Sequence, residues 1–300
     1  MTELVEVRSL GHRASVKDYL ALTKPRIIVL LVITAYCAMV VAQGGWPSIR
    51  LTVAALLGLA LSTAGAHSIN MWYDRDIDAI MSRTRRRPVV TGRIAPSTAI
   101  LFGIGLELAS IVLLVWQVNL LTAVWSTAGF LFYVFVYTFW LKRRTPQNIV
   151  IGGAAGAFPP LVGWAAVTGQ VSLAALWMFL IVFLWTPPHF WALALYKQDD
   201  YRRAGIPMMP VVQGEQSTKR QSIVYSVLLL GASIGLYATH AVDVWYLVIA
   251  LALGLGFLMA HLPLMRERLP QVRWAKRTFH VSLWYMTGIF AAMIVGSIVH

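Results

Sequence analysis

Nine long apolar runs leave few folds open to this chain. Of its 300 residues, 58% are hydrophobic and only 12% are charged. A helix of about 20 apolar residues spans the hydrocarbon core of a bilayer, and only helices or closed barrels satisfy their backbone hydrogen bonds there. The sequence therefore predicts an all-α polytopic membrane protein with nine transmembrane helices, the first of which begins near Tyr19. The runs are 27–42, 51–69, 98–116, 121–141, 148–168, 172–195, 221–239, 243–263 and 278–298.

Basic residues gather on one side of the predicted membrane. The formal net charge of +13 would suit a nucleic-acid binder, but the placement of the charges argues against a nucleic-acid partner. Of the 25 Lys and Arg, only Arg50 falls in a loop on the other side. The remaining 24 lie in the N-terminal tail and first helix and in segments 75–93, 142–144, 197–220 and 266–277.

This bias predicts how the chain lies in the membrane. Short loops rich in Lys and Arg remain in the cytoplasm, so residues 1–20 are expected to be a cytoplasmic tail and His300 to lie on the opposite side. We expect a multi-pass protein of the plasma (inner) membrane whose basic side contacts anionic lipid heads of the bilayer. The first 26 residues carry charges of both signs and predict no signal peptide.

Asn70, Asp74 and Asp78 stand at four-residue intervals directly after the second apolar run. On a helix such steps keep the three side chains on one face. Carboxylates at the end of a membrane-buried helix are costly unless a cation lies between them. Mg²⁺ prefers oxygen ligands and is often shared between one or two carboxylates and substrate phosphates. The motif predicts a diphosphate site at the membrane surface; a solvated charged loop is the alternative.

Other polar residues lie close to this motif in the sequence. Arg83 and the arginines at 85–87 follow within a dozen residues and are suited to hold phosphate oxygens. His67 lies near the same helix face, where it either contacts substrate and carries protons or bonds backbone at the helix end. Arg75 and Asp76 point away from that face and are expected to form an orienting or solvated pair.

A second polar group surrounds the end of the sixth run. There Pro187 and Pro188 are expected to break the helix, which membrane proteins tolerate where a cavity is lined. His189 and Asp200 are eleven residues apart, which is within about 20° of eclipsed on a helix, and Tyr196 lies near the same face. These three residues are expected on one wall of a pocket. His189 either contacts a metalloporphyrin iron, a propionate or a substrate, or bonds a neighbouring carbonyl.

Three features inside the apolar runs complete the pattern. Small residues at 152–157 favour close helix packing, and Pro159 and Pro160 after them either pack closely or widen a cavity. Glu107 lies at membrane depth and is expected to face the bundle interior, with a structural and a catalytic role both open. Cys37 has no disulfide or metal-site partner and is expected to pack in the core.

These motifs resemble those of the UbiA-type intramembrane prenyltransferases. The first aspartate-rich motif of that superfamily matches Asn70-x-x-x-Asp74-x-x-x-Asp78. Segments 141–164, 185–191 and 200–212 are similar to its heme branch, together with Arg83-Thr84 and Arg87-Pro88. One departure is the second loop, which in the wider superfamily carries Asp-x-x-x-Asp and here reads Lys197-x-x-Asp200. The number of Mg²⁺ ions is therefore open, and Lys197 is a candidate to neutralise phosphate instead.

The resemblance implies a fold and a reaction. The fold is one UbiA-type membrane domain over residues 1–300, with nine helices around a central cavity that opens to lipid under cytoplasmic loops. The reaction joins heme B, farnesyl diphosphate and water to give heme O and diphosphate, for heme-copper oxidase biogenesis. Mg²⁺ is the implied cofactor and heme B a substrate. Heme A synthase or terminal oxidase assembly factors are implied partners, and the farnesyl length rests on the resemblance alone.

The resemblance also implies roles for individual residues. Asn70, Asp74 and Asp78 would hold Mg²⁺ on the diphosphate, and Asp200 would add a contact from the second loop. The implied substrate contacts are Arg83, Arg87, Lys142, Lys197, His67, His189 and Tyr196, of which Lys142 is alternatively a positive anchor at the membrane surface.

Two other functions are compatible with parts of the sequence. A prenyltransferase acting on a quinone precursor or a tetrapyrrole alcohol would share the first motif, but the segments around His189 and Pro207 favour the heme branch. A carrier or channel would place broken helices and polar sites near the midplane. Here the polar residues cluster at one membrane face, and the opposite loops are short, which favours an enzyme.

Overall fold

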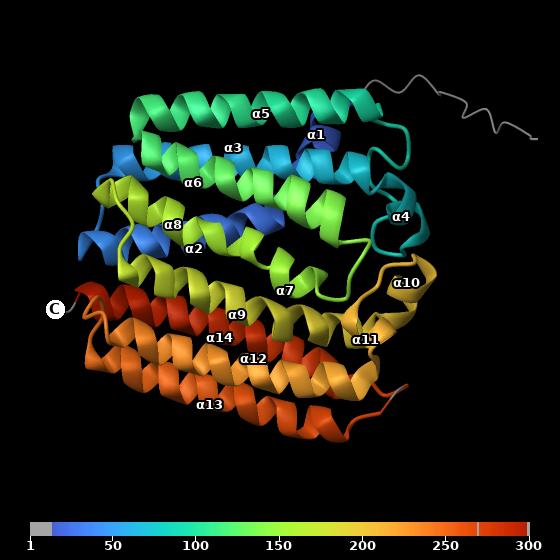
Figure 1. Cartoon of the computed structure of the whole chain (residues 1–300). Coiled ribbons are helices and arrows are strands. Elements are labelled where there is room, and N and C mark those ends of the chain that lie inside the picture. The colour runs from blue at the N-terminus through green and yellow to red at the C-terminus, as the bar shows by residue number, and fades with distance from the viewer. Residues whose placement is uncertain (1–13, 269, 299–300) are drawn as a thin grey trace, which may run out of the picture.

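The computed structural model describes residues 14–268 and 270–298, which form a bundle of helices without a β-strand (Figure 1). In this part of the chain, eight helices are long and apolar enough to cross a membrane, so the expected all-α polytopic fold is confirmed. They are α2 (Pro25–Gln43), α3 (Ile49–Tyr73), α5 (Pro96–Gln117), α6 (Leu120–Leu131) with the π-helix η1 (Phe132–Leu141), α7 (Asn148–Gly152) with α8 (Ala154–Thr168), α9 (Leu173–Tyr196), α13 (Val244–Arg266) and α14 (Arg273–Ile298).

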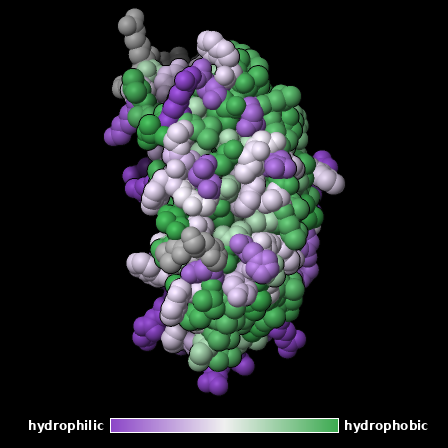
Figure 2. Space-filling model, turned by 90° about the vertical axis from the view of Figure 1, so that its left-hand side faces the viewer, coloured by the Kyte–Doolittle hydropathy of each residue, from purple (hydrophilic) through white to green (hydrophobic). Residues whose placement is uncertain are grey.

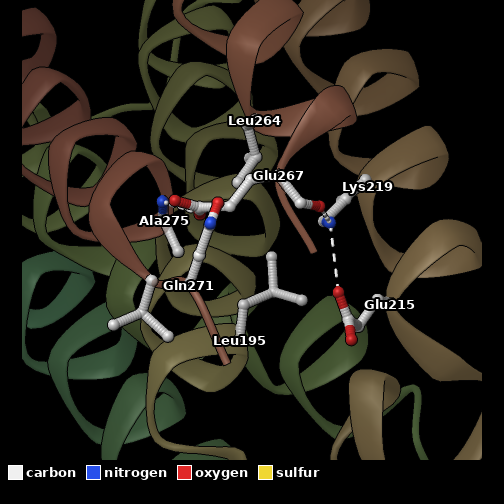
Figure 3. A pocket seen from close by; sticks show the side chains of 8 residues that line it. Leu195, Glu215, Lys219, Leu264, Glu267, Gln271 and Ala275 are labelled. Atoms are coloured by element: carbon white, nitrogen blue, oxygen red, sulfur yellow. Dashed lines mark hydrogen bonds and ion pairs between the residues drawn. The ribbon is translucent and has the colours of Figure 1, made fainter. Parts of the chain in front are cut away.

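The one predicted span missing from these eight, 221–239, lies largely in α12 (Gly214–Tyr237), which packs against α9 and α13. Glu215 and Lys219 make the start of this helix polar. Lys219 is buried and donates to Glu215 Oε2 at 3.2 Å and to the Glu267 carbonyl, beside a hollow with room for about one water (Figure 3). Glu267 in turn accepts hydrogen bonds from the first backbone amides of α14. Nine is therefore an approximate count of the spanning helices.

The two ends of the bundle differ in their connections. Short helices α4 (Arg75–Ile80), α10 (Gln198–Arg203) and α11 (Met209–Val212) lie together at one end, on the right in Figure 1, which we name the charged end. The opposite, short-loop end holds only brief connections. Figure 2 views this end and shows hydrophilic residues in small groups among apolar ones. The polar loops thus gather where the sequence predicts a site.

The first spanning helix begins later than expected. A separate helix, α1 (Val16–Thr23), precedes it and is capped at Ser15, whose side chain and that of Asp18 bond each other's backbone amides. Lys24 then adopts a left-handed conformation with φ 54°, and Pro25 opens α2. The expectation of a helix starting near Tyr19 is therefore wrong, because the turn at Lys24 separates the two helices. Residues 1–13 of the expected tail and His300 lie outside the described residues.

The prolines of the sixth run do not break their helix. Pro187 and Pro188 lie inside α9, which continues to Tyr196. The fixed φ of proline is compatible with a helix even though two backbone donors are lost, and Thr186 donates its hydroxyl to the Val182 carbonyl at 2.8 Å. Both prolines are buried between neighbouring helices, whose packing holds α9 together. The expected break at this point is therefore wrong.

Close helix contacts surround the middle of the bundle. A Cβ atom at Gly163 of α8 would lie 2.1 Å from the Ala35 carbonyl of α2, and one at Gly65 of α3 would lie 2.5 Å from the Gly103 carbonyl of α5. These helix pairs can approach only because glycine has no side chain. Cys37 is fully buried in the same region, which confirms its expected place in the core.

Candidate active site

A cavity of about 930 Å³ lies between α2, α3, α6, α8, α9 and α14. The wall of the cavity nearest the charged end is polar and includes Lys24, Asn70 and Asp78. Its deeper walls are mainly apolar and aromatic. One cavity therefore joins a charged cluster to a space for apolar molecules, which is the usual composition of a small-molecule site.

The aspartate motif lies at this polar wall. Helix α3 ends at Tyr73 and α4 begins at Arg75, yet the backbone amides of Asp74 and Asp78 still bond the carbonyls four residues earlier, at 2.9 and 2.8 Å. The helical spacing therefore continues across the junction. Asn70, Asp74 and Asp78 are all buried, and Asn70 Nδ2 donates to Asp74 Oδ2 at 2.7 Å. The structure brings the motif together as the spacing predicts.

Each member of the motif contacts a cation. Lys24 Nζ donates to Asn70 Oδ1 at 2.7 Å, Lys142 forms an ion pair with Asp74, and Arg87 forms one with Asp78. Burial, followed by the charges of Arg87 and Lys142, holds the pKa of Lys24 well below its usual range, although Asp74 and Asp78 oppose this. Three basic side chains face two carboxylates here, so the cluster is suited to a further anion.

The donor set also fits a magnesium ion. Two carboxylates and an amide oxygen are hard ligands, and Mg²⁺ commonly completes its shell with phosphate oxygens. Asp74 Oδ1 is buried and accepts no hydrogen bond; Arg143 Nη2 lies 3.7 Å from it. Among the described residues, no group of three or more His, Cys, Asp or Glu gathers to hold a metal. A metal at this motif would therefore need ligands from a bound phosphate.

Asp76 lies outside the cluster, as expected for a residue that points away from the helix face of the motif. Its carboxylate receives two hydrogen bonds of 2.7 Å from Arg143, and the first of the causes that lower its pKa to about 2 is this guanidinium. Arg75 instead donates to the Trp72 carbonyl at 2.8 Å. Asp76 therefore pairs with Arg143, not with Arg75.

His67 lies on the cavity wall one turn before the motif. Its Nδ1 lies 2.8 Å from the Thr23 carbonyl, which can only accept a hydrogen bond, so Nδ1 carries a proton. Its ring meets Tyr133 edge to face at 5.5 Å. Both open interpretations of His67 thus find support, since it bonds backbone and also lines the cavity.

A second arm of the cavity is lined by aromatic residues of α9 and α14. The His189 ring is stacked between Trp185 and Phe279, with centroids 4.2 and 4.5 Å apart. The Ser282 hydroxyl donates its proton to the Phe279 carbonyl at 2.7 Å. Ser282 Oγ must therefore accept the hydrogen bond that it shares with His189 Nδ1 at 2.6 Å, so Nδ1 is the donor. Within the described residues His189 Nε2 has no hydrogen-bond partner, and its lone pair is available to a ligand.

The expected wall of His189, Tyr196 and Asp200 is only partly present. His189 and Tyr196 line the cavity, but Lys197, with φ −116° and ψ 19°, ends α9 before Asp200 is reached. Asp200 accepts a hydrogen bond from Ser82 at 2.7 Å, which is the leading cause of its lowered pKa. Asp200 lies outside the residues that line the cavity, so the continuous-helix argument that placed it on one wall with His189 is wrong. Lys197, which the resemblance implies as a phosphate contact, is exposed and also lies outside the cavity lining.

Three other basic residues expected to contact substrate also line the cavity. They are Arg83, Arg87 and Lys142, of which Arg87 and Lys142 pair with the carboxylates of the motif. Glu107 is buried, as expected for a residue that faces the bundle interior, and neither of its carboxylate oxygens makes a hydrogen bond of normal geometry, although the hydroxyls of Ser62 and Thr127 lie nearby.

The sequence did not single out three residues of the site. Lys24 reads as one of many basic residues near the membrane surface, yet it contacts Asn70, 46 positions away. Thr138 accepts a hydrogen bond from Asn70 Nδ2 at 3.1 Å, and Asn148 lines the cavity with a buried Oδ1 that has no partner. In the sequence, the one signal that marks Thr138 is that it is a polar residue within an apolar run.

Comparisons with known proteins agree with this geometry. Solved structures share the fold: digeranylgeranylglyceryl phosphate synthase has a TM-score of 0.79 at 20% identity, over 95% of this chain and 99% of that one. A UbiA homologue from Archaeoglobus fulgidus bound to GPP and Mg²⁺ has a TM-score of 0.67 at 20% identity, over 92% and 99%.

Sequence relatives are much more similar. A protoheme IX farnesyltransferase of Symbiobacterium thermophilum is 58% identical over 93% of this chain and 94% of its own length. A protoheme IX farnesyltransferase of Acidiphilium cryptum is 45% identical over 99% and 95%. Residues 31–284 match the UbiA prenyltransferase family. The chain therefore belongs to the UbiA prenyltransferase family, as a relative of its protoheme IX farnesyltransferases.

Proposed function

We propose that this enzyme transfers a farnesyl group from farnesyl diphosphate to a vinyl group of heme B, with addition of water, to form heme O and diphosphate. The observation that carries the proposal is a cavity that joins a cluster of three basic side chains and two carboxylates to an aromatic arm with an available imidazole nitrogen. The relatives named for this activity support the identity of both substrates.

The charged cluster is suited to bind and release diphosphate. Asn70, Asp74 and Asp78 would hold Mg²⁺, which when bound supplies positive charge to the departing diphosphate. Lys142 and Arg87, which now pair with the carboxylates, turn their donors to phosphate oxygens as negative charge develops there.

Aromatic residues form the wall next to the cluster. Tyr133, Tyr137 and Phe130 line the cavity at this level, and their ring faces attract an allylic cation. The cation must be shielded from bulk water until the heme vinyl group attacks it. Water then adds to the new cationic carbon and gives up a proton, which completes the hydroxyethylfarnesyl group.

The aromatic arm is suited to the acceptor. A planar macrocycle packs well against aromatic side chains such as Trp185 and Phe279, which cover both faces of the His189 imidazole and leave its Nε2 edge to a ligand. The His189 Nε2 lone pair accepts a hydrogen bond or ligates the heme iron, and a pigment spectrum distinguishes these two contacts. The product would serve heme-copper oxidase biogenesis, with heme A synthase or oxidase assembly factors as recipients.

Pigment analysis tests the reaction directly. Membranes that contain the full chain are incubated with heme B, farnesyl diphosphate and Mg²⁺, and the hemes are separated and weighed by mass spectrometry. We expect a heme with a hydroxyethylfarnesyl group that disappears with EDTA or with the Asp78→Asn variant. If well-folded protein forms no new heme but releases diphosphate with a quinone precursor or a tetrapyrrole alcohol, a different acceptor is established. Uptake of unchanged substrate into sealed vesicles would indicate a carrier.

We also propose that the charged end faces the cytoplasm of a plasma (inner) membrane and that residues 1–300 act as one domain. The bias of basic residues to this end supports the orientation. Cys37 is buried, so single cysteines introduced at exposed positions report sidedness without background. Labelling of Arg202→Cys only from the cytoplasmic side, and of Trp46→Cys only from the opposite side, is expected; the reverse would contradict the orientation.

A further inference from the structure

We propose that the prenyl chain ends against a closed floor half way through the bundle, and that Leu59 and Val162 of this floor limit the chain to the length of farnesyl. This inference rests on the proposed function, because it concerns the prenyl diphosphate bound at the charged cluster. It assigns chain-length selection to specific residues, which the sequence alone leaves open.

The cavity ends at a similar level on the six long helices that line it. On each of them the lining residues extend from the charged end to the middle of the helix or somewhat past it, and stop before the last turn at the short-loop end. The last lining residues, which we name the floor, are Thr34 of α2, Leu59 of α3, Ser126 of α6, Val162 of α8, Val182 of α9 and Phe290 of α14. Agreement among six helices indicates a closed end, not a gap between two of them.

Tightly packed residues lie at this level and directly beneath it. Leu59 and Val162 form one buried cluster with Ala35, and Met39 and Ala55 belong to the next cluster toward the short-loop end. All five are at most 5% exposed. The carbonyl of Ala35 lies so close to Gly163 that no added Cβ would fit there. A chain therefore cannot extend past the floor without displacing packed side chains.

The depth of the cavity can be counted along two helices. Leu59 precedes Asn70 by eleven residues of α3, which at the helical rise corresponds to about 16 Å. Thr34 follows Lys24, the partner of Asn70, by ten residues, which corresponds to about 15 Å. Helix α2 runs away from the charged end and α3 runs toward it, yet both give the same depth for the cavity.

This depth matches a particular prenyl chain. An extended farnesyl chain measures about 14 Å from its first carbon, and each further isoprene unit adds about 5 Å. Farnesyl therefore reaches the floor from the charged cluster, whereas geranylgeranyl would have to fold back or push into the packed layer. A geranyl chain leaves the last turn above Leu59 unfilled.

The aromatic arm and the part of the cavity next to the aspartate motif are formed by different helices, so the prenyl chain can occupy the latter. His189, Trp185 and Phe279 belong to α9 and α14, whereas the wall that descends from Asn70 is made by α2, α3 and α6, with Leu30 and Ala66 among its apolar residues. A chain attached to the diphosphate therefore lies along Leu30 and Ala66 and meets Leu59 at its far end.

Binding of unreactive analogues tests the floor without heme. The purified full chain, with Mg²⁺, is offered thiolodiphosphate analogues of geranyl, farnesyl and geranylgeranyl in competition. We expect wild type to prefer farnesyl over geranylgeranyl, and Leu59→Ala or Val162→Ala to shift this ratio about tenfold toward geranylgeranyl, the effect of a few methylenes in an apolar pocket. Ser126→Leu, which removes no hydroxyl hydrogen bond, should shift the preference toward geranyl.

Leu229→Ala is the matched control, since Leu229 is equally buried but lies outside the cavity lining. Its length preference should equal that of wild type. If neither Leu59→Ala nor Val162→Ala changes the ratio more than this control, the chain leaves the cavity sideways and the floor proposal is wrong. Failure of all three analogues to bind overturns both proposals. Binding with the expected preferences but no prenylated heme would reject the proposed reaction alone.

Discussion

Replacement of Asp74 by asparagine removes the most buried charge of the site while keeping its shape. The Asp74 side chain is 0% exposed and pairs with Lys142, whose side chain is 17% exposed. Removal of one partner of a fully buried pair costs about 3–5 kcal/mol. Because Lys142 still reaches the cavity, we expect a smaller loss of stability for Asp74→Asn, about 2 kcal/mol.

The loss of activity should be larger than the loss of stability. Without the carboxylate of Asp74, the three basic side chains of the cluster face one carboxylate instead of two. One metal contact is also lost, at the point where charge develops on the diphosphate. Loss of one such electrostatic contact typically lowers kcat by about 100- to 1,000-fold.

Asp76→Asn is the control for this experiment. Asp76 is two residues away, and its side chain is 61% exposed in its pair with Arg143, a kind of pair that contributes at most about 1 kcal/mol. Both variants are assayed for heme product and for thermal unfolding in detergent. Turnover of Asp74→Asn within about threefold of Asp76→Asn, with the protein folded, would refute the assignment of Asp74 to the metal-diphosphate site.

Three further predictions follow from the same contacts. Arg87→Met should raise KM for the prenyl diphosphate about tenfold or more, as loss of a charged hydrogen bond predicts, and an unchanged KM would place Arg87 outside the substrate site. His189→Phe keeps the stacking but removes Nε2, so it should weaken heme binding in a spectral titration without changing prenyl-analogue affinity; equal heme affinity would exclude a polar contact. The folded pKa of Asp76, about 2, lies below its unfolded value, so its pair with Arg143 stabilises the protein above about pH 4 and loses this effect as pH falls toward 2. Because the pair is exposed, wild type and Asp76→Asn should differ in stability by no more than about 0.5 kcal/mol. In acid unfolding this difference should vanish near pH 2. A difference that grows as the pH falls would contradict the prediction.

Local spacing predicted the centre of the site well. Asn70, Asp74 and Asp78 depend only on helical periodicity over nine residues, and the hydrogen bonds of the backbone preserve that periodicity across the α3–α4 junction. The apolar runs predicted the helices for a similar reason, because each span satisfies its own backbone in lipid.

Predictions that depended on a helix continuing or ending were less successful. Asp200 was placed with His189 by counting through Lys197, where α9 in fact ends. The expected break at Pro187 is absent, since α9 continues through both prolines, which are buried. Lys24 joins the site only through tertiary contact with Asn70. Such contacts between distant segments leave no periodic signal in one sequence.

The packing at the floor and directly beneath it also bears on whether ions can cross the bundle. Ions and protons cross a membrane protein along a continuous polar or hydrated path, and the packed apolar side chains of Ala35, Leu59, Val162, Met39 and Ala55 offer no such path between α2, α3 and α8. A charged site can therefore lie toward one membrane surface while this apolar layer separates it from the other.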